Sequence, residues 1–249
     1  MHPEIVVGTP PELAQRFLAE LAHDISSLRA GSRLTLAVPG GSVGDSIFPT
    51  LANAPFEWKD VDIFWTDERA VPPSSPDSNF AQADRLWLTP ARVPQSCIHR
   101  MPADDGDLAR ATASYARTMQ DLAGIPPTLD RVLLGVGADG HVASVFPGDP
   151  SIQSSDFVTW TARAPKAPRT RMSLSLKSLA RGRHIVIAAF DVAKAFVIAS
   201  AVRDPADSTP LALLLRTSDR PRLFLTADVV DAMGTPNVRA PTLHGRRNT

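Results

Sequence analysis

Short apolar segments alternate with segments of helical pattern along most of the chain. The predicted strands are near-continuous apolar runs at residues 34–38, 61–65, 131–136, 185–190 and 222–226. The predicted helices between them cover residues 43–51, 79–88, 107–123 and 192–202. Strands that are apolar on both faces are typical of parallel sheets covered by helices on both sides. We therefore expect an α/β fold with a doubly wound, mainly parallel sheet and helices on both faces.

A further predicted helix near the N-terminus carries clear signals at both ends. Thr9 is followed by proline, and Glu12 stands three residues later, which is the spacing of a capping box with proline at the first helical position. The apolar face of this helix is expected to hold Leu13, Phe17, Leu21, Ile25 and Leu28. Gly31 is expected to supply the left-handed residue that ends it.

Composition narrows the classes of protein to consider. The chain has 249 residues, and its 26 basic and 26 acidic residues balance, which removes the usual basis for a nucleic-acid or membrane-surface partner. Cys97 is the only cysteine, and neither a secretory signal nor a membrane-spanning apolar run is visible. We expect a cytoplasmic monomer or weak homodimer with no membrane partner. We also expect a single domain over residues 1–249 with a poorly ordered tail after about residue 238.

Glycines follow the predicted strand at 34–38. Residues 39–42 read Pro-Gly-Gly-Ser and lead into the predicted helix at 43–51. Glycines allow close approach of the backbone to an anion, and a helix N-terminus offers free N–H groups. Gly40, Gly41 and Ser42 are therefore candidates for binding a phosphate, with an unliganded tight turn as the equal alternative. No Gly-Lys-Ser/Thr follows, so this is not a nucleotide-hydrolysing loop.

Charged residues follow the predicted strand at 61–65. The residues after the carboxyl end of this strand are Thr66, Asp67, Glu68 and Arg69. In parallel α/β sheets, ligands bind at the carboxyl ends of the strands. We interpret Asp67 and Arg69 as site candidates. For Glu68 we expect a local salt bridge on the rim rather than a catalytic role.

A glycine-rich turn follows the predicted strand at 131–136. Residues 135–140 match the pattern Gly-x-Gly-x-x-Gly, which alone is a weak signal for a dinucleotide site. Asp139 would place a carboxylate where the pyrophosphate should lie, and Pro147 cuts short the helix that should follow, so we reject that interpretation. We expect instead that the turn presents His141 as a general base oriented by Asp139. A structural or surface histidine is the ordinary alternative.

Among the basic residues in the second half of the chain, four are considered for anion binding: Lys166, Arg169, Arg171 and Lys194. Lys194 would stand in the first turn of a helix, against the helix dipole, which makes sense where an anion binds. For Lys166 and Arg169 we expect solvated surface positions. The six histidines show no zinc-binding spacing, so no metal is expected.

These segments together resemble one known family. The matching stretches are residues 39–42, 65–69, 71–72, 77–79, 133–141, 143–144, 146–148, 171–176, 183–184 and Lys194. Their order and types are similar to the 6-phosphogluconolactonases, within the glucosamine-6-phosphate isomerase/6-phosphogluconolactonase family. The resemblance runs from about residue 34 to 200. It implies a Rossmann-like α/β sheet and cofactor-free hydrolysis of 6-phospho-D-glucono-1,5-lactone to 6-phosphogluconate in the oxidative pentose phosphate pathway.

The resemblance also implies a role for each candidate residue. His141 would activate the attacking water, and Asp139 would orient it. Arg69 would stabilise the developing oxyanion or hold the sugar, and Asp67 would contact hydroxyl groups or the base. The 6-phosphate would be bound by Gly40, Gly41, Ser42, Arg171 and Lys194.

The sequence departs from the family pattern at a few positions. Val43 and Gly44 follow Ser42 where the family usually has Thr-Pro, and Val142 replaces the usual Thr, so phosphate contacts are expected to differ in detail. Two alternatives remain: a sugar-phosphate deaminase or isomerase on the same fold, and a non-catalytic sugar-phosphate sensor. Phe146 stands where the deaminases carry an acid, and a sensor has no need of the Asp139–His141 pair.

Overall fold

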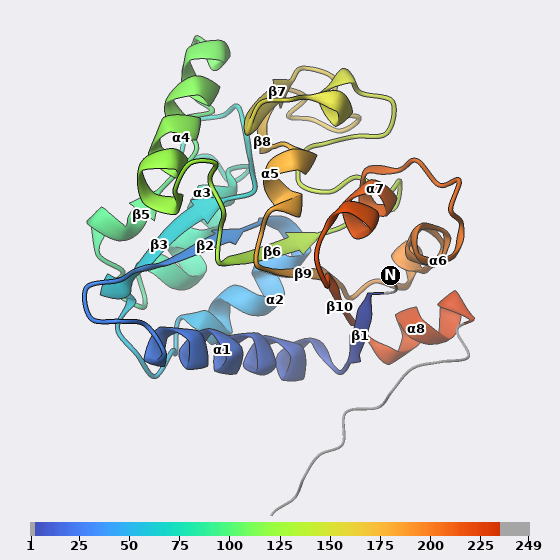
Figure 1. Ribbon diagram of the computed structural model, residues 1–249, viewed down its shortest axis with the longest axis horizontal. Helices are drawn as coiled ribbons and strands as arrows, with labels where there is room; N and C mark the ends of the chain where they lie inside the picture. Colours follow the sequence, from blue (N-terminus) through green and yellow to red (C-terminus); the bar gives the residue numbers. More distant parts are fainter. Residues whose placement is uncertain (1–2, 235–249) are drawn as a thin grey trace, which may run out of the picture.

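Two β-sheets are present in the computed structural model, which describes residues 3–234 (Figure 1). The main sheet has the strand order β1 (Glu4–Val7), β10 (Arg222–Leu225), β9 (His184–Ala189), β6 (Arg131–Gly135), β2 (Leu34–Val38), β3 (Val61–Trp65) and β5 (Ile98–His99). Its neighbouring strands all pair in parallel. The smaller, antiparallel sheet has the order β4 (Asp67–Arg69), β8 (Arg171–Leu174) and β7 (Val158–Thr161). The predicted α/β fold with a mainly parallel sheet is confirmed.

Helices connect most of the strands. The α-helices are α1 (Pro10–Ser26), α2 (Gly41–Leu51), α3 (Asn79–Ala83), α4 (Leu108–Ala123), α5 (Leu176–Ala180), α6 (Ala195–Arg203), α7 (Pro210–Thr217) and α8 (Ala227–Met233). The shorter turns are the 3₁₀ segments η1 (Trp58–Asp60), η3 (Gln95–Cys97), η4 (Pro150–Gln153) and η5 (Val192–Lys194), and the π-helical η2 (Asp84–Leu88). The helix predicted over 79–88 is α3 continued by η2, and the one over 192–202 is η5 continued by α6. No helix within residues 3–234 is long and apolar enough to cross a membrane.

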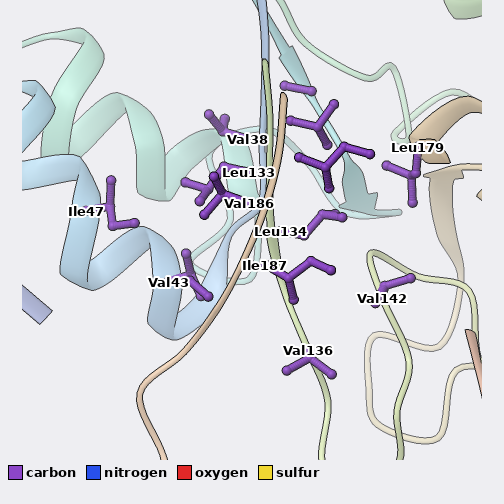
Figure 2. Packing of buried hydrophobic residues seen from close by; sticks show 14 of the residues in the cluster. Val38, Val43, Ile47, Leu133, Leu134, Val136, Val142, Leu179, Val186 and Ile187 are labelled. Atoms are coloured by element: carbon purple, nitrogen blue, oxygen red, sulfur yellow. The ribbon is translucent and has the colours of Figure 1, made fainter. Parts of the chain in front are cut away.

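The hydrophobic core lies on both faces of the main sheet. Successive residues of a strand point to opposite faces, and Figure 2 shows this for β6. Leu133 lies on the side where Val43 and Ile47 of α2 pack, whereas Leu134 lies on the side of Leu179 in α5. All five side chains are almost completely buried. Helices thus cover both faces, as the apolar strands predict.

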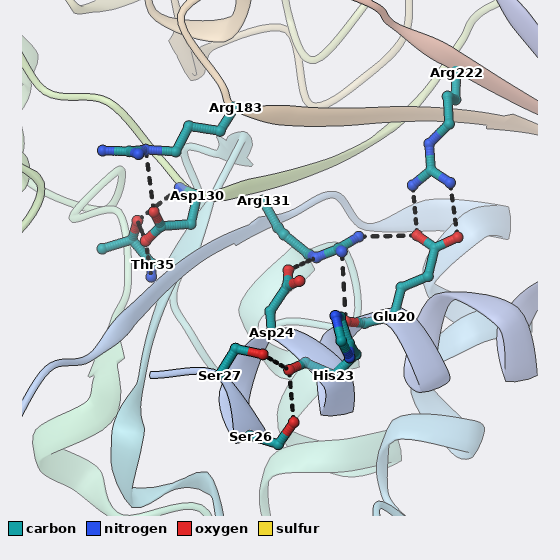
Figure 3. Close-up of polar contacts among 10 residues, drawn as sticks. All are labelled: Glu20, His23, Asp24, Ser26, Ser27, Thr35, Asp130, Arg131, Arg183 and Arg222. Carbon is teal, nitrogen blue, oxygen red and sulfur yellow. Dashed lines mark hydrogen bonds and ion pairs between the residues drawn. The ribbon is translucent and has the colours of Figure 1, made fainter. Parts of the chain in front are cut away.

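Helix α1 begins as predicted and ends earlier than predicted. The capping box at Thr9 is present. The hydroxyl groups of Ser26 and Ser27 both donate hydrogen bonds to the carbonyl oxygen of His23, at 2.7 and 2.9 Å, and the helix stops there (Figure 3). Such hydroxyls compete with the helical N–H donors for carbonyl oxygens. Gly31 does have a left-handed backbone, with φ of 80°, but it lies in the turn after the helix end.

An ion-pair network joins α1 to the amino ends of two strands (Figure 3). Arg222 begins β10, and its guanidinium donates to both carboxylate oxygens of Glu20, at 2.7 and 2.5 Å. Arg131 begins β6 and donates to Glu20 at 3.0 Å and also to Asp24. The network therefore fixes α1 at the end of the sheet opposite to the carboxyl ends of the strands.

The strand order reverses between β2 and β6, which are neighbours in the main sheet. The chain continues from β2 toward β3 on one side and from β6 toward β9 on the other. Connections that leave in opposite directions open a crevice at the carboxyl ends of the strands. A single residue, Thr66, separates β3 from β4, so the chain passes there from the main sheet directly into the smaller one. Both sheets consequently border the crevice.

Candidate active site

A pocket of about 150 Å³ lies at this reversal point. It is lined by Pro39, Gly40, Gly41, Ser42, Val43, Asp67, Arg69, Asn79, Gly135, Val136, His141, Ala143, Arg171 and Lys194. All of the predicted site residues except Asp139 are in this set. The structure therefore brings together residues that are up to 154 positions apart, from Gly40 to Lys194.

The first turn of α2 forms one wall of the pocket. Gly40 is its N-cap, and no side chain caps the helix. The first N–H groups of an α-helix have no partner within the helix, so they can bind an anion here. A Cβ atom at Gly40 would lie 1.9 Å from the Oδ1 atom of Asn79, and Gly41 has a φ of 63°. Position 40 requires glycine because the Asn79 side chain lies too close for a Cβ atom. Position 41 favours glycine because its backbone is left-handed.

Arg171 and Lys194 line the pocket and form no ion pair with an acidic side chain within residues 3–234. Arg171 is 9% exposed and forms no ion pair within residues 3–234; it donates hydrogen bonds to the carbonyl oxygens of Pro168, at 2.8 Å, and Lys166, at 3.4 Å. Burial, together with the charge of Arg69, lowers the pKa of Arg171. Burial also lowers the pKa of Lys194. A partly buried cation without a counter-charge is stabilised by a bound anion.

Strand β4 carries Asp67 into the interior, where it is 6% exposed. Its Oδ2 atom accepts a hydrogen bond of 2.6 Å from the hydroxyl group of Ser144. Its backbone carbonyl accepts one of 2.8 Å from the Nδ2 atom of Asn79. Asp67 thus lines the pocket and also connects three segments of the chain.

Glu68 does not form the rim salt bridge that the sequence predicts. It is 4% exposed and has no cationic partner in the described part of the chain. Its carboxylate accepts hydrogen bonds from the backbone N–H groups of Arg69, Asn79 and Phe80 and from the hydroxyl group of Ser78, at 2.7 to 2.9 Å. Burial raises the pKa of Glu68, against these hydrogen bonds. Three of the four donors lie at the start of α3, where free N–H groups require an acceptor, so Glu68 fixes that helix onto β4.

Two buried polar atoms of the pocket have no partner among residues 3–234. They are the Nε atom of Arg69, whose Nη1 donates to the carbonyl oxygen of Asp77 at 2.6 Å, and the Oδ1 atom of Asn79. Buried polar atoms are rarely left unpaired, so a donor and an acceptor are available to a ligand here. Asn79 was not predicted as a site residue. Its place directly after Ser78, the N-cap of α3, is the signal that could have indicated it.

The turn after β6 holds His141 against Asp139. The Nδ1 atom of His141 lies 2.5 Å from the Oδ1 atom of Asp139, which also accepts a hydrogen bond from the backbone N–H of His141 at 3.2 Å. The hydrogen bond to His141 lowers the pKa of Asp139. The His141 side chain is 30% exposed, and its Nε2 atom has no partner within the described range. An imidazole that lines the pocket, is held at Nδ1 and has no bonded partner at Nε2 among the described residues is arranged as a general base requires.

Two larger hollows flank β7, with volumes of about 540 and 550 Å³. Trp160 borders both, and neither contains any predicted site residue. Convergent polar groups, rather than volume, distinguish the pocket at the reversal point. Residues 3–234 contain no cluster of three or more histidine, cysteine or acidic residues that could hold a metal ion.

Comparison with known proteins gives a consistent result. The family model of the glucosamine-6-phosphate isomerases/6-phosphogluconolactonase matches residues 8–223. A 6-phosphogluconolactonase of Streptomyces coelicolor is 32% identical over 217 residues, which are 80% of this chain and 83% of that protein. One of Mycobacterium leprae is 33% identical over 198 residues, covering 75% and 80% of the two chains. The solved structure of 6-phosphogluconolactonase from Trypanosoma brucei superposes with a TM-score of 0.80 at 25% identity, over 92% of this chain and 98% of that one. The chain belongs to the glucosamine-6-phosphate isomerase/6-phosphogluconolactonase family.

Proposed function

We propose that this protein hydrolyses 6-phospho-D-glucono-1,5-lactone to 6-phospho-D-gluconate. The observation that supports this most directly is one pocket that combines a helix N-terminus without a side-chain cap, two cations that form no ion pair within residues 3–234, and a histidine held by an aspartate. The first two features suit a phosphate group, and the third suits activation of water. A phosphorylated lactone presents both chemistries in one small molecule.

The phosphate group would bind at the start of α2. Gly40, Gly41 and Ser42 would supply backbone N–H donors, and Arg171 and Lys194 would supply positive charge. Binding a dianion there fixes one end of the substrate, and this remote binding energy positions the lactone carbonyl carbon at the other end.

His141 would act as the general base. Its Nε2 atom takes a proton from water as the water oxygen bonds to the carbonyl carbon, C1, and the carbonyl oxygen becomes an oxyanion. Asp139 accepts a hydrogen bond from Nδ1–H, which keeps Nε2 unprotonated and stabilises the imidazolium that forms. The oxyanion would be stabilised by Arg69, whose Nε has no other partner in the described residues.

Collapse of this tetrahedral species completes the reaction. The C1=O bond forms again, the bond between C1 and the ring oxygen breaks, and the imidazolium returns its proton to the ring oxygen. One water is consumed and a carboxylic acid forms, which ionises to the carboxylate. Asp67 would accept a hydrogen bond from a substrate hydroxyl group or support the base, and Asn79 adds a second acceptor nearby.

The test is the initial rate of hydrolysis of freshly generated lactone, with the spontaneous rate subtracted. Release of ammonia from glucosamine 6-phosphate is measured beside it. Acceleration of the first reaction with no ammonia release supports the proposal. Ammonia release without lactone hydrolysis would establish the deaminase instead, and binding of 6-phosphogluconate without either reaction would establish a sensor.

The phosphate contacts are tested separately. Replacing Arg171 or Lys194 by alanine should raise KM by at least about tenfold with a smaller effect on kcat, because both cations are partly buried and form no ion pair among the described residues. Arg169 is exposed, as predicted, and its alanine variant is the matched control, for which KM should stay unchanged. Unchanged KM in both test variants would refute the phosphate site. A cytoplasmic location and a monomeric or weakly dimeric state stay predictions.

A further inference from the structure

Among residues 3–234, the imidazole of His141 makes one hydrogen bond, and this bond does not by itself fix the ring. The bond to Asp139 holds the Nδ1 atom, but the ring can still tilt about that contact. The His141 side chain is 30% exposed, and water on that side does not restrict the orientation of the ring. A general base must keep its Nε2 atom aimed at the water, so further contacts are needed to hold the ring plane.

Phe146 makes such a contact. Its ring is 4.7 Å from the His141 ring, centroid to centroid, with 48° between the ring planes. Phe146 is only 6% exposed. The chain reaches it through a tight reversal in which the N–H of Val145 donates to the carbonyl oxygen of Val142 at 3.0 Å and Ala143 has a left-handed φ of 50°. This reversal places the ring of Phe146 beside the imidazole of His141, five residues earlier in the chain.

Gly137 makes the second contact. A Cβ atom at this position would lie 2.1 Å from Nδ1 and 2.2 Å from Cε1 of His141, and 2.5 Å from Oδ1 of Asp139. The backbone of Gly137 therefore lies directly against the edge of the imidazole that bonds to Asp139. Its N–H also donates to the carbonyl oxygen of His141 at 2.9 Å, which closes the turn. Any larger residue would displace the ring or its aspartate.

We propose that Phe146 and Gly137 are positioning residues that together hold the plane of the His141 imidazole, Phe146 by its ring and Gly137 by the lack of a side chain. Neither residue contacts the reacting atoms; both act through His141. The expected effect on catalysis rests on the proposed function, in which His141 is the general base. The packing of Phe146 and Gly137 against His141 is independent of that function.

Phe146→Leu and Phe146→Ala are the test variants, and Phe17→Leu is the matched control. Phe17 is a fully buried phenylalanine of α1, so its substitution also costs packing energy. In the Phe146→Ala variant, kcat should fall by about tenfold to a hundredfold while KM stays within about twofold. Phe146→Leu should recover part of that loss because leucine keeps most of the apolar contact. The Phe17→Leu variant should lose stability and keep kcat.

An NMR measurement decides the packing without relying on activity. The ring carbon-bound protons of His141, assigned by their loss in His141→Asn, lie beside an aromatic ring and should shift in Phe146→Leu but not in Phe17→Leu. Unshifted signals, or a kcat in Phe146→Ala that matches wild type, would overturn the proposal. If wild type does not hydrolyse the lactone, the proposed function fails, and the NMR shifts still decide whether Phe146 holds the ring.

Discussion

The hydroxyl group of Ser144 donates a hydrogen bond of 2.6 Å to the Oδ2 atom of Asp67, and both residues are buried. Ser144 lies in the segment after β6, and Asp67 begins β4. The backbone N–H of Ser144 also donates to the hydroxyl oxygen of Ser173 in β8, at 3.0 Å. The segment that carries His141 is thereby joined to the smaller sheet by two buried hydrogen bonds.

Substitution of Ser144 by alanine should destabilise the protein. The change leaves the Oδ2 atom of Asp67 buried without its donor, which costs about 1–3 kcal/mol of the free energy of unfolding. Urea unfolding measures this loss. Ser178→Ala is the control, because Ser178 is equally buried and its hydroxyl group has no partner among the described residues. Equal losses in the two variants would show that the bond to Asp67 contributes nothing.

Substitution of Asp139 by asparagine should reduce kcat by at least about a hundredfold with little change in KM. An asparagine can present its amide N–H to Nδ1, which favours the tautomer with the proton on Nε2, so the base is lost. Initial-rate kinetics of lactone hydrolysis measure the effect. Asp121→Asn, on the exposed face of α4, should behave as wild type. A kcat for Asp139→Asn close to that of wild type would remove Asp139 from the mechanism.

The two glycines at the start of α2 should respond differently to alanine. In Gly40→Ala, the new Cβ atom meets the Oδ1 atom of Asn79. The Asn79 side chain cannot move away without breaking the hydrogen bond that its Nδ2 atom donates to the carbonyl oxygen of Asp67, so we expect a loss of about 2 kcal/mol or more in the free energy of unfolding. In Gly41→Ala the space is open and only the left-handed backbone is strained, which costs about 1 kcal/mol. Thermal unfolding of the two variants measures which loses more stability. A larger loss in Gly41→Ala than in Gly40→Ala would contradict the close contact between Gly40 and Asn79.

Glu20 should make stability depend on pH in the acid range. Burial alone would raise its pKa, but the hydrogen bonds and charges of Arg222 and Arg131 outweigh this and lower the pKa from 4.5 to about 2. A carboxylate with a lowered pKa stabilises the fold fully above the unfolded-state value, and this contribution is lost as pH falls from about 4.5 to about 2.

The Glu20→Gln variant should therefore be less stable than wild type at pH 7, by about 1–2 kcal/mol after allowance for solvent screening. The difference should shrink as pH falls toward 2. Urea unfolding at a series of pH values measures it. Glu57→Gln, which removes an exposed pair with Lys59, is the control and should change stability little, because exposed ion pairs contribute little. A difference that stays constant down to pH 2 would mean that the ion pairs are not its source.

Five strands of the main sheet (β2, β3, β6, β9 and β10) could be predicted because they are apolar runs that pattern alone identifies. The edge strands β1 and β5 were not predicted, since each is short and β5 has only two residues. Strands β2 and β3 are buried at every position, as their sequences indicate. The smaller sheet could not be predicted in this way. Strand β4 has three residues, all charged, and nothing in its sequence distinguishes a strand from a loop. It forms because it pairs with β8, a segment about a hundred residues away.

The same limit applies to the candidate site. Residues at the ends of recognisable strands, such as His141 and Ser42, could be placed from the sequence because the edge of a parallel sheet gathers them. Glu68 was misplaced because its three hydrogen-bond donors at the start of α3 come from a loop whose path the sequence does not specify.

The single-residue junction at Thr66 has a consequence for how such a protein can change in evolution. The N–H of Thr66 donates to Val38 of β2, and its carbonyl oxygen accepts from Leu174 of β8, so this residue is hydrogen-bonded to both sheets. Arg69 and Arg171 belong to strands β4 and β8 of the smaller sheet. His141 and the start of α2 follow strands β6 and β2 of the main sheet. A rotation of the smaller sheet about Thr66 would change the spacing between the arginines and the start of α2 without replacing any of these residues, while the bonds of Ser144 to Asp67 and Ser173 would keep the His141 segment with the smaller sheet. The size of the molecule that fits would then depend on the angle between the two sheets, which residues remote from the pocket can change.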